Sequence, residues 1–122
     1  MRWTLILSLL LVLASCNKAS AYKNVSVSDL HSASEAEYVL LDVRQPDEFA
    51  EGHVQGSRLI PLGELEARTA ELPDDQPIYV ICRSGNRSKT ASQILNKAGK
   101  KDVRNVQGGI VAWMAAGYPV QR

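Results

Sequence analysis

The feature that most constrains this chain is an apolar segment that ends at a cysteine and is followed by a short polar loop and a helix-like run. The apolar segment, residues 77–81, predicts a buried strand, and residues 89–97 have the composition of a helix. A buried strand that passes through a tight loop directly into a helix is typical of a layered α/β domain. Ligands of such domains bind at the carboxyl ends of the strands, so the loop marks a candidate site.

The loop reads Cys82-Arg83-Ser84-Gly85-Asn86-Arg87-Ser88 and predicts a reactive thiol. Backbone N–H groups, two guanidiniums and a helix N-terminus each favour the thiolate of Cys82, which is the nucleophilic form. Gly85 lets the loop curl with its N–H groups inward. Arg83 and Arg87 are expected to hold an anionic substrate, Arg87 more strongly than Arg83, because a guanidinium fork fits oxyanions. The other loop residues are expected to contribute mainly through their backbone N–H groups: Ser84, Asn86 and Ser88.

Strand-like and helix-like segments alternate along the rest of the chain. The expected strands are residues 25–27, 38–41, 58–60, 78–81 and 103–106. One expected helix begins at Asp29 with Ser28 as its N-cap, and another begins at Pro46 and ends at Gly52. Further helices are expected over residues 63–72, 88–98 and 109–116. This alternation predicts one α/β domain with a mostly parallel sheet.

Three motifs, taken in order along the chain, resemble the signatures of the rhodanese superfamily. The cysteine loop is the second of them. The first comprises residues 41–44 (Leu-Asp-Val-Arg), Glu48-Phe49, residues 52–57 (Gly-His-Val-Gln-Gly-Ser) and Ile60-Pro61. The third comprises residues 106–110 (Val-Gln-Gly-Gly-Ile), Trp113 and residues 117–120. The resemblance implies a rhodanese-like fold, with a mostly parallel central sheet of about five strands and helices on both faces.

The resemblance also implies a sulfurtransferase that works through a persulfide on Cys82. The thiolate would take the outer sulfur of a small anionic donor, thiosulfate or a similar compound, and pass it to a thiol or cyanide acceptor. No metal or organic cofactor is expected. A nucleic-acid partner is not expected either, because basic and acidic residues balance once Arg2 is removed with a leader.

Two other functions stay open. One is a persulfide carrier or binding module, with a protein partner that loads or unloads Cys82. The other is a phosphatase or arsenate reductase, because the same fold carries both kinds of chemistry. Six residues run from Cys82 to Arg87, whereas the loops of the related phosphatases have one more. The shorter loop favours sulfur over phosphate.

Several other polar or aromatic residues invite a catalytic role but are expected to be structural. The resemblance implies that Asp42 and Arg44 form a structural pair near the pocket, and that the ring of His53 caps a turn. Trp113 and Tyr118 are expected to pack the last helix against the sheet. No cluster of His, Cys or carboxylate residues has the spacing of metal ligands.

The first residues of the chain predict export. Residues 1–15 combine one positive charge with an apolar run that suits a signal-peptide core. The run ends in Leu13-Ala14-Ser15-Cys16, which resembles the bacterial lipobox, so Cys16 is expected to be lipidated and to begin the mature chain. Residues 16–23 would be the lipidated cysteine and its tether, and residues 24–122 the rhodanese domain.

These segments together predict a lipoprotein that is anchored in a membrane and faces the periplasm. Asn17 beside the lipidated cysteine slightly favours the outer membrane. The alternative is an ordinary secretory peptide in which Cys16 is incidental.

Overall fold

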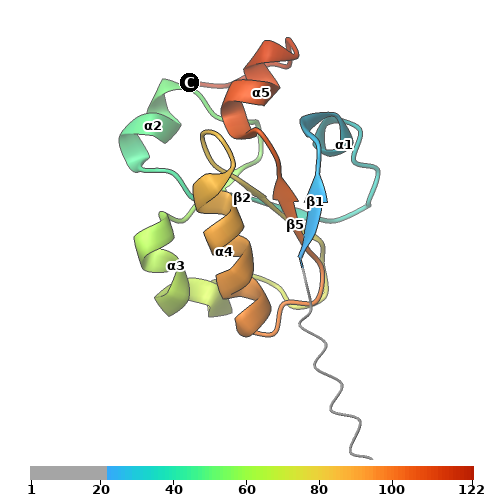
Figure 1. Ribbon diagram of the computed structural model, residues 1–122, viewed down its shortest axis with the longest axis vertical. Coiled ribbons are helices and arrows are strands. Elements are labelled where there is room, and N and C mark those ends of the chain that lie inside the picture. The colour runs from blue at the N-terminus through green and yellow to red at the C-terminus, as the bar shows by residue number, and fades with distance from the viewer. Residues whose placement is uncertain (1–21) are drawn as a thin grey trace, which may run out of the picture.

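The computed structural model describes residues 22–122, which form a five-stranded sheet covered by helices (Figure 1). Its strands are β1 (Lys23–Val25), β2 (Val39–Asp42), β3 (Arg58–Leu59), β4 (Ile78–Ile81) and β5 (Val103–Val106). Their order across the sheet is β1-β5-β4-β2-β3, and every neighbouring pair is parallel. The structure therefore confirms the predicted α/β class, its parallel sheet and its number of strands.

Helices cover both faces of this sheet. They are α1 (Val27–His31), α2 (Pro46–Glu51), α3 (Leu62–Arg68), α4 (Asn86–Lys97) and α5 (Gly109–Ala115), and a single 3₁₀ turn (Thr69–Glu71) follows α3. Leu65 of α3 and Leu95 of α4 belong to the buried cluster on one face. Leu30 of α1 and Trp113 of α5 belong to the cluster on the other. β4 is the middle strand of the sheet between these two layers of helices, so it lies at the centre of the fold.

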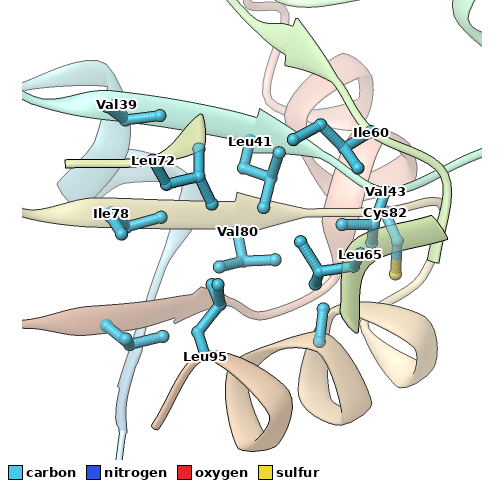
Figure 2. Packing of buried hydrophobic residues seen from close by; sticks show 12 residues of the cluster. Val39, Leu41, Val43, Ile60, Leu65, Leu72, Ile78, Val80, Cys82 and Leu95 are labelled. Atoms are coloured by element: carbon cyan, nitrogen blue, oxygen red, sulfur yellow. The ribbon is translucent and has the colours of Figure 1, made fainter. Parts of the chain in front are cut away.

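Side chains of β4 alternate between the two clusters, which explains why the strand is apolar throughout. Val80 packs on the side of α3 and α4, and Ile81 packs on the side of α1 and α5. All four residues of β4 are buried, and burying one aliphatic side chain contributes roughly 1.5–3 kcal/mol. Figure 2 shows the first cluster, with Cys82 at one end of it. The loop after β4 thus starts from a rigid base.

The aromatic residues near the C-terminus pack as expected. Trp113 is 4% exposed and lies in the second cluster, where its indole N–H donates to the carbonyl oxygen of Pro119 at 2.9 Å. Tyr118 is partly buried against the same cluster and stacks on His31 of α1, with 3.9 Å between ring centroids. These contacts join α1, α5 and the last residues into one layer.

Three predicted helices have boundaries that are wrong by one to four residues. Ser26, not Ser28, is the N-cap of α1, because its hydroxyl and the Asp29 carboxylate each accept the other residue's backbone N–H. The helix expected over residues 88–98 already begins at Asn86, since Gly85 adopts a left-handed backbone with φ of 110° and starts it there. The helix expected over residues 63–72 starts at Leu62 and tightens after Arg68 into the 3₁₀ turn.

The predicted signal peptide (residues 1–15), Cys16 and most of the tether lie outside the described residues. Lys23 is the first residue of β1, so the sheet begins one residue inside the segment expected to be tether. Among residues 22–122, no helix is both long enough and apolar enough to cross a membrane.

Candidate active site

Cys82 lies at the carboxyl end of the central strand, where the chain turns into the loop that leads to α4. The first turn of α5 holds this loop from the side. The backbone N–H of Ile110 donates to the carbonyl oxygen of Cys82 at 2.8 Å, and that of Val111 donates to the carbonyl oxygen of Arg83 at 3.1 Å. The loop after β4 is therefore fixed by a helix that begins 27 residues later in the chain.

The sulfur of Cys82 lies among hydrogen-bonding groups of its own loop. The backbone N–H of Gly85 donates to Sγ at 3.1 Å, and the hydroxyl of Ser88 lies 3.4 Å from Sγ. That hydroxyl also donates to the carbonyl oxygen of Gly85 at 3.1 Å. Cys82 is only 1% exposed, so its sulfur has little direct contact with solvent.

These contacts lower the pKa of the Cys82 thiol. Burial acts in the opposite direction and raises the pKa, because a thiolate is poorly solvated away from water. The hydrogen bond with the Ser88 hydroxyl and those from the backbone N–H groups of Ser88, Gly85 and Ser84 outweigh burial and bring the pKa below its ordinary value. The loop therefore favours the thiolate, as its sequence predicts, and it does so chiefly through hydrogen bonds.

Alkylation of Cys82 by iodoacetamide should have a pH midpoint below the value of about 8.5 for a free cysteine. Ser88→Ala should raise this midpoint, because it removes a side-chain hydrogen bond that lowers the pKa of the thiol. Ser84→Ala is the matched control, since the contribution of Ser84 is its backbone N–H, and it should leave the midpoint unchanged. A midpoint for the unaltered protein at or above 8.5, or equal shifts in both variants, would contradict this account.

The two loop arginines are in different situations. Arg83 is exposed, and its side chain makes no hydrogen bond with any residue between 22 and 122. Arg87 is only partly exposed, because both of its terminal nitrogens donate to the carboxylate of Glu48 on α2, at 2.6 and 2.8 Å. A cleft of about 200 Å³ lies between α2 and α5, with Glu48 and Arg83 in its wall. Of the two expected anion ligands, only Arg83 has its whole guanidinium available.

Asp42 and Arg44 form the structural pair that the resemblance implies. The Arg44 guanidinium donates to both carboxylate oxygens of Asp42, at 2.8 to 3.1 Å, and both side chains are buried. The same guanidinium also donates to the carbonyl oxygens of Glu48 and Gly52, at 3.2 and 2.8 Å. The pair therefore ties the end of β2 to both ends of α2 and sets the position of that helix.

The ring of His53 has the expected structural place. Its Nδ1 lies 2.9 Å from the carbonyl oxygen of Phe49, and the ring stacks on that of Phe49 with 3.8 Å between centroids. The backbone of His53 exchanges two hydrogen bonds with Gln121. Within residues 22–122, no group of three or more His, Cys, Asp or Glu side chains could hold a metal ion.

Two residues that shape this site carry no predicted role. Glu48 belongs to the first motif, but its partner Arg87 is 39 residues away in the sequence. Gly109 is predicted only to start a helix, whereas a side chain there would overlap the carbonyl groups of Cys82 and Arg83. The sequence signal that α5 approaches another backbone closely was the glycine pair Gly108-Gly109. In the structure both of these residues have positive φ.

Comparisons with known proteins agree with this geometry. The family model described as "Rhodanese-like domain" matches residues 26–116. The chain is 34% identical over 122 aligned residues to "Thiosulfate sulfurtransferase 18" of Arabidopsis thaliana, a match that covers 88% of this chain and 90% of the relative. It is 43% identical over 74 residues to a Bacillus subtilis protein named "Uncharacterized protein YqhL", of which it spans 59%. Among solved structures, a rhodanese-related protein from Thermoplasma volcanium has 39% identity and a TM-score of 0.75, with 82% of this chain and 98% of that one covered.

Proposed function

This chain belongs to the rhodanese family, and from that premise we propose that it is a sulfurtransferase whose sulfur-carrying nucleophile is Cys82. The observation that carries the proposal is the position of Sγ, which lies in a ring of N–H groups at the end of the central strand with a lowered pKa. A thiolate in such a place attacks sulfane sulfur, and the ring can hold the product persulfide.

In the first step the Sγ thiolate attacks the outer sulfur of thiosulfate. The bond between the two sulfur atoms of thiosulfate breaks, its electron pair leaves with sulfite, and Cys82 becomes a persulfide anion. In the second step cyanide or a thiolate attacks the terminal sulfur, forming thiocyanate or a new persulfide and restoring the Cys82 thiolate. Both steps transfer one sulfur atom from one nucleophile to another, so the total charge is conserved and no external oxidant or reductant is consumed.

The loop residues have distinct parts in this proposal. The backbone N–H of Gly85 already donates to Sγ, and those of Ser84 and Ser88 also lower the pKa of the thiol. Together with the N–H of Asn86, they would hold the terminal sulfur of the persulfide. Arg83 orients the anionic end of the donor from the cleft, with a smaller contribution from the paired Arg87. The loop of six residues from Cys82 to Arg87 supports sulfur transfer over the phosphatase or arsenate reductase alternative.

Intact-mass analysis tests the proposal directly. Incubation with thiosulfate should add one sulfur atom to the protein, and subsequent cyanide should remove it with formation of thiocyanate. Steady turnover of thiosulfate and cyanide by the purified protein would favour the enzyme over the carrier alternative. A persulfide that forms but is released only when a partner protein is added would favour the carrier. No gain of sulfur from any donor would refute both.

We also propose that the protein is an exported lipoprotein, anchored to a membrane through lipid on Cys16 and facing the periplasm. The support is the apolar run of residues 5–14 and the motif Leu13-Ala14-Ser15-Cys16. Mass spectrometry of the membrane fraction should find Cys16 as a lipidated first residue. Cys16→Ala should release an active domain from the membrane, and finding unmodified Cys16 in the exported protein would refute the anchor.

A further inference from the structure

The guanidinium of Arg87 is already occupied by a carboxylate. Its Nη1 donates to Oε1 of Glu48 at 2.6 Å and its Nη2 donates to Oε2 at 2.8 Å, which makes a two-point ion pair between α4 and α2. The pair is partly buried, with 33% of the Arg87 side chain and 21% of the Glu48 side chain exposed. Two-point pairing of this kind uses the edge of the guanidinium that would otherwise bind a sulfonate group.

Glu48 is a fixed acceptor, unlike a mobile acid on the surface. Its Oε1 also accepts the backbone N–H of Gln45 at 3.1 Å, which closes a capping box at the start of α2. Its carbonyl oxygen accepts a hydrogen bond from the buried guanidinium of Arg44 at 3.2 Å. The hydrogen bonds from Arg87 lower the pKa of the Glu48 carboxyl to about 2, so it is ionised wherever the thiolate exists.

The ion pair changes the charge that a donor meets at the mouth of the site. Arg83 and Arg87 supply two positive charges, the ionised Glu48 cancels one, and the thiolate of Cys82 cancels the other. Glu51, in the wall of the same cleft, adds a further acidic side chain. Asp42 and Arg44 cancel each other. A dianion gains from each cation that is not already compensated, whereas a donor with one negative charge gains less.

We propose that Glu48 determines donor specificity: by pairing with Arg87, it disfavours dianionic sulfur donors relative to sulfane donors that carry one negative charge. This inference rests on the proposed sulfurtransferase function and names the class of donor for the same site. Methanethiosulfonate is the matched probe for thiosulfate, since a methyl group replaces one charged oxygen. Attack of the Cys82 thiolate on its outer sulfur again gives the persulfide, and the electron pair leaves with methanesulfinate.

Glu48→Gln tests the proposal, because it keeps the size of the side chain and one hydrogen-bond acceptor but removes the charge. Asp47→Asn is the matched control, since it removes one exposed charge from the neighbouring position of α2 and Asp47 makes no ion pair with residues 22–122. Two kinds of measurement are made at constant ionic strength. One is kcat and KM for each donor with cyanide as acceptor, and the other is the sulfate concentration that half-protects Cys82 from iodoacetamide.

Glu48→Gln should lower both the KM for thiosulfate and the half-protecting sulfate concentration by about fivefold, because the freed guanidinium can bind the dianion. The kcat of Glu48→Gln and its KM for methanethiosulfonate should change by less than about twofold. The same limit should hold for the kinetic constants and the half-protecting sulfate concentration of Asp47→Asn. Several results would overturn the proposal. They are equal effects of the two variants, equal effects on the two donors, weaker anion binding in Glu48→Gln, or no protection by sulfate in any protein.

Sulfate protection keeps this test separate from the proposed function, since it requires no sulfur transfer. If no donor loads Cys82 while Glu48→Gln still strengthens protection by sulfate, the sulfurtransferase proposal fails and the anion selectivity of the site stands. If the unaltered protein turns over both donors and Glu48→Gln changes neither their ratio nor the protection, the specificity proposal alone fails.

Discussion

Cys82→Ser is expected to lower sulfur transfer from thiosulfate to cyanide by at least about a thousandfold. A serine hydroxyl cannot form the persulfide, and it lacks a base that would activate it for any other attack. The side-chain partners of Cys82 among the described residues are the Gly85 N–H and the Ser88 hydroxyl, and neither is a base. The loss should fall on the chemical step, so the variant should gain no sulfur by intact mass.

The same substitution should leave the fold intact. Serine is similar in size, and its oxygen can accept the N–H of Gly85 that Sγ accepts now. Urea unfolding should therefore give a free energy of unfolding within about 1 kcal/mol of the unaltered protein. A variant that kept a tenth or more of the turnover, which is a loss of roughly tenfold at most, would show that Cys82 is not the sulfur carrier. A large loss of stability would leave the loss of activity without a chemical interpretation.

The parts of the fold that are predictable from the sequence depend on local patterns. The apolar run of β4 is continuous because its side chains are buried on both faces, and such a run is readable without knowledge of its neighbours. The position of Cys82 at a strand end follows from that run and from the glycine-containing loop after it. The N-cap of α1 was predicted wrongly at Ser28, although Ser26 and Asp29 have the spacing of a capping box.

The parts that were not predictable depend on contacts between distant segments. The loop sequence presents Arg87 as a free cation, and only the packing of α2 beside α4 shows that Glu48 occupies it. The loop sequence predicts a reactive thiol, but it does not indicate that Cys82 is almost fully buried. The spacing of residues along the chain carries neither fact, because each depends on which elements become neighbours once the sheet has formed.

Gly109→Ala is expected to destabilise the protein by about 3 kcal/mol or more, because two costs combine. Gly109 has φ of 59°, in the left-handed region that costs a side-chain-bearing residue about 1–2 kcal/mol. In addition, the new methyl group would overlap the carbonyl oxygens of Cys82 and Arg83, which are backbone atoms in the loop that starts at Cys82. Gly117→Ala isolates the first cost, because Gly117 has φ of 80° and no atom lies within 4 Å of an added Cβ.

The overlap in Gly109→Ala should also damage the site in the molecules that remain folded. The carbonyl oxygens that it displaces accept the hydrogen bonds of Ile110 and Val111, so the loop would move relative to α5 and the ring of N–H groups around Sγ would open. A displacement of about 1 Å at a reacting group can cost on the order of a hundredfold in rate. Compared with Gly117→Ala, Gly109→Ala should therefore have a lower free energy of unfolding in urea and a slower turnover. Its pH midpoint of Cys82 alkylation should be higher. Equal losses in the two variants would show that backbone strain alone acts, and that the approach of α5 to the loop does not position the thiolate.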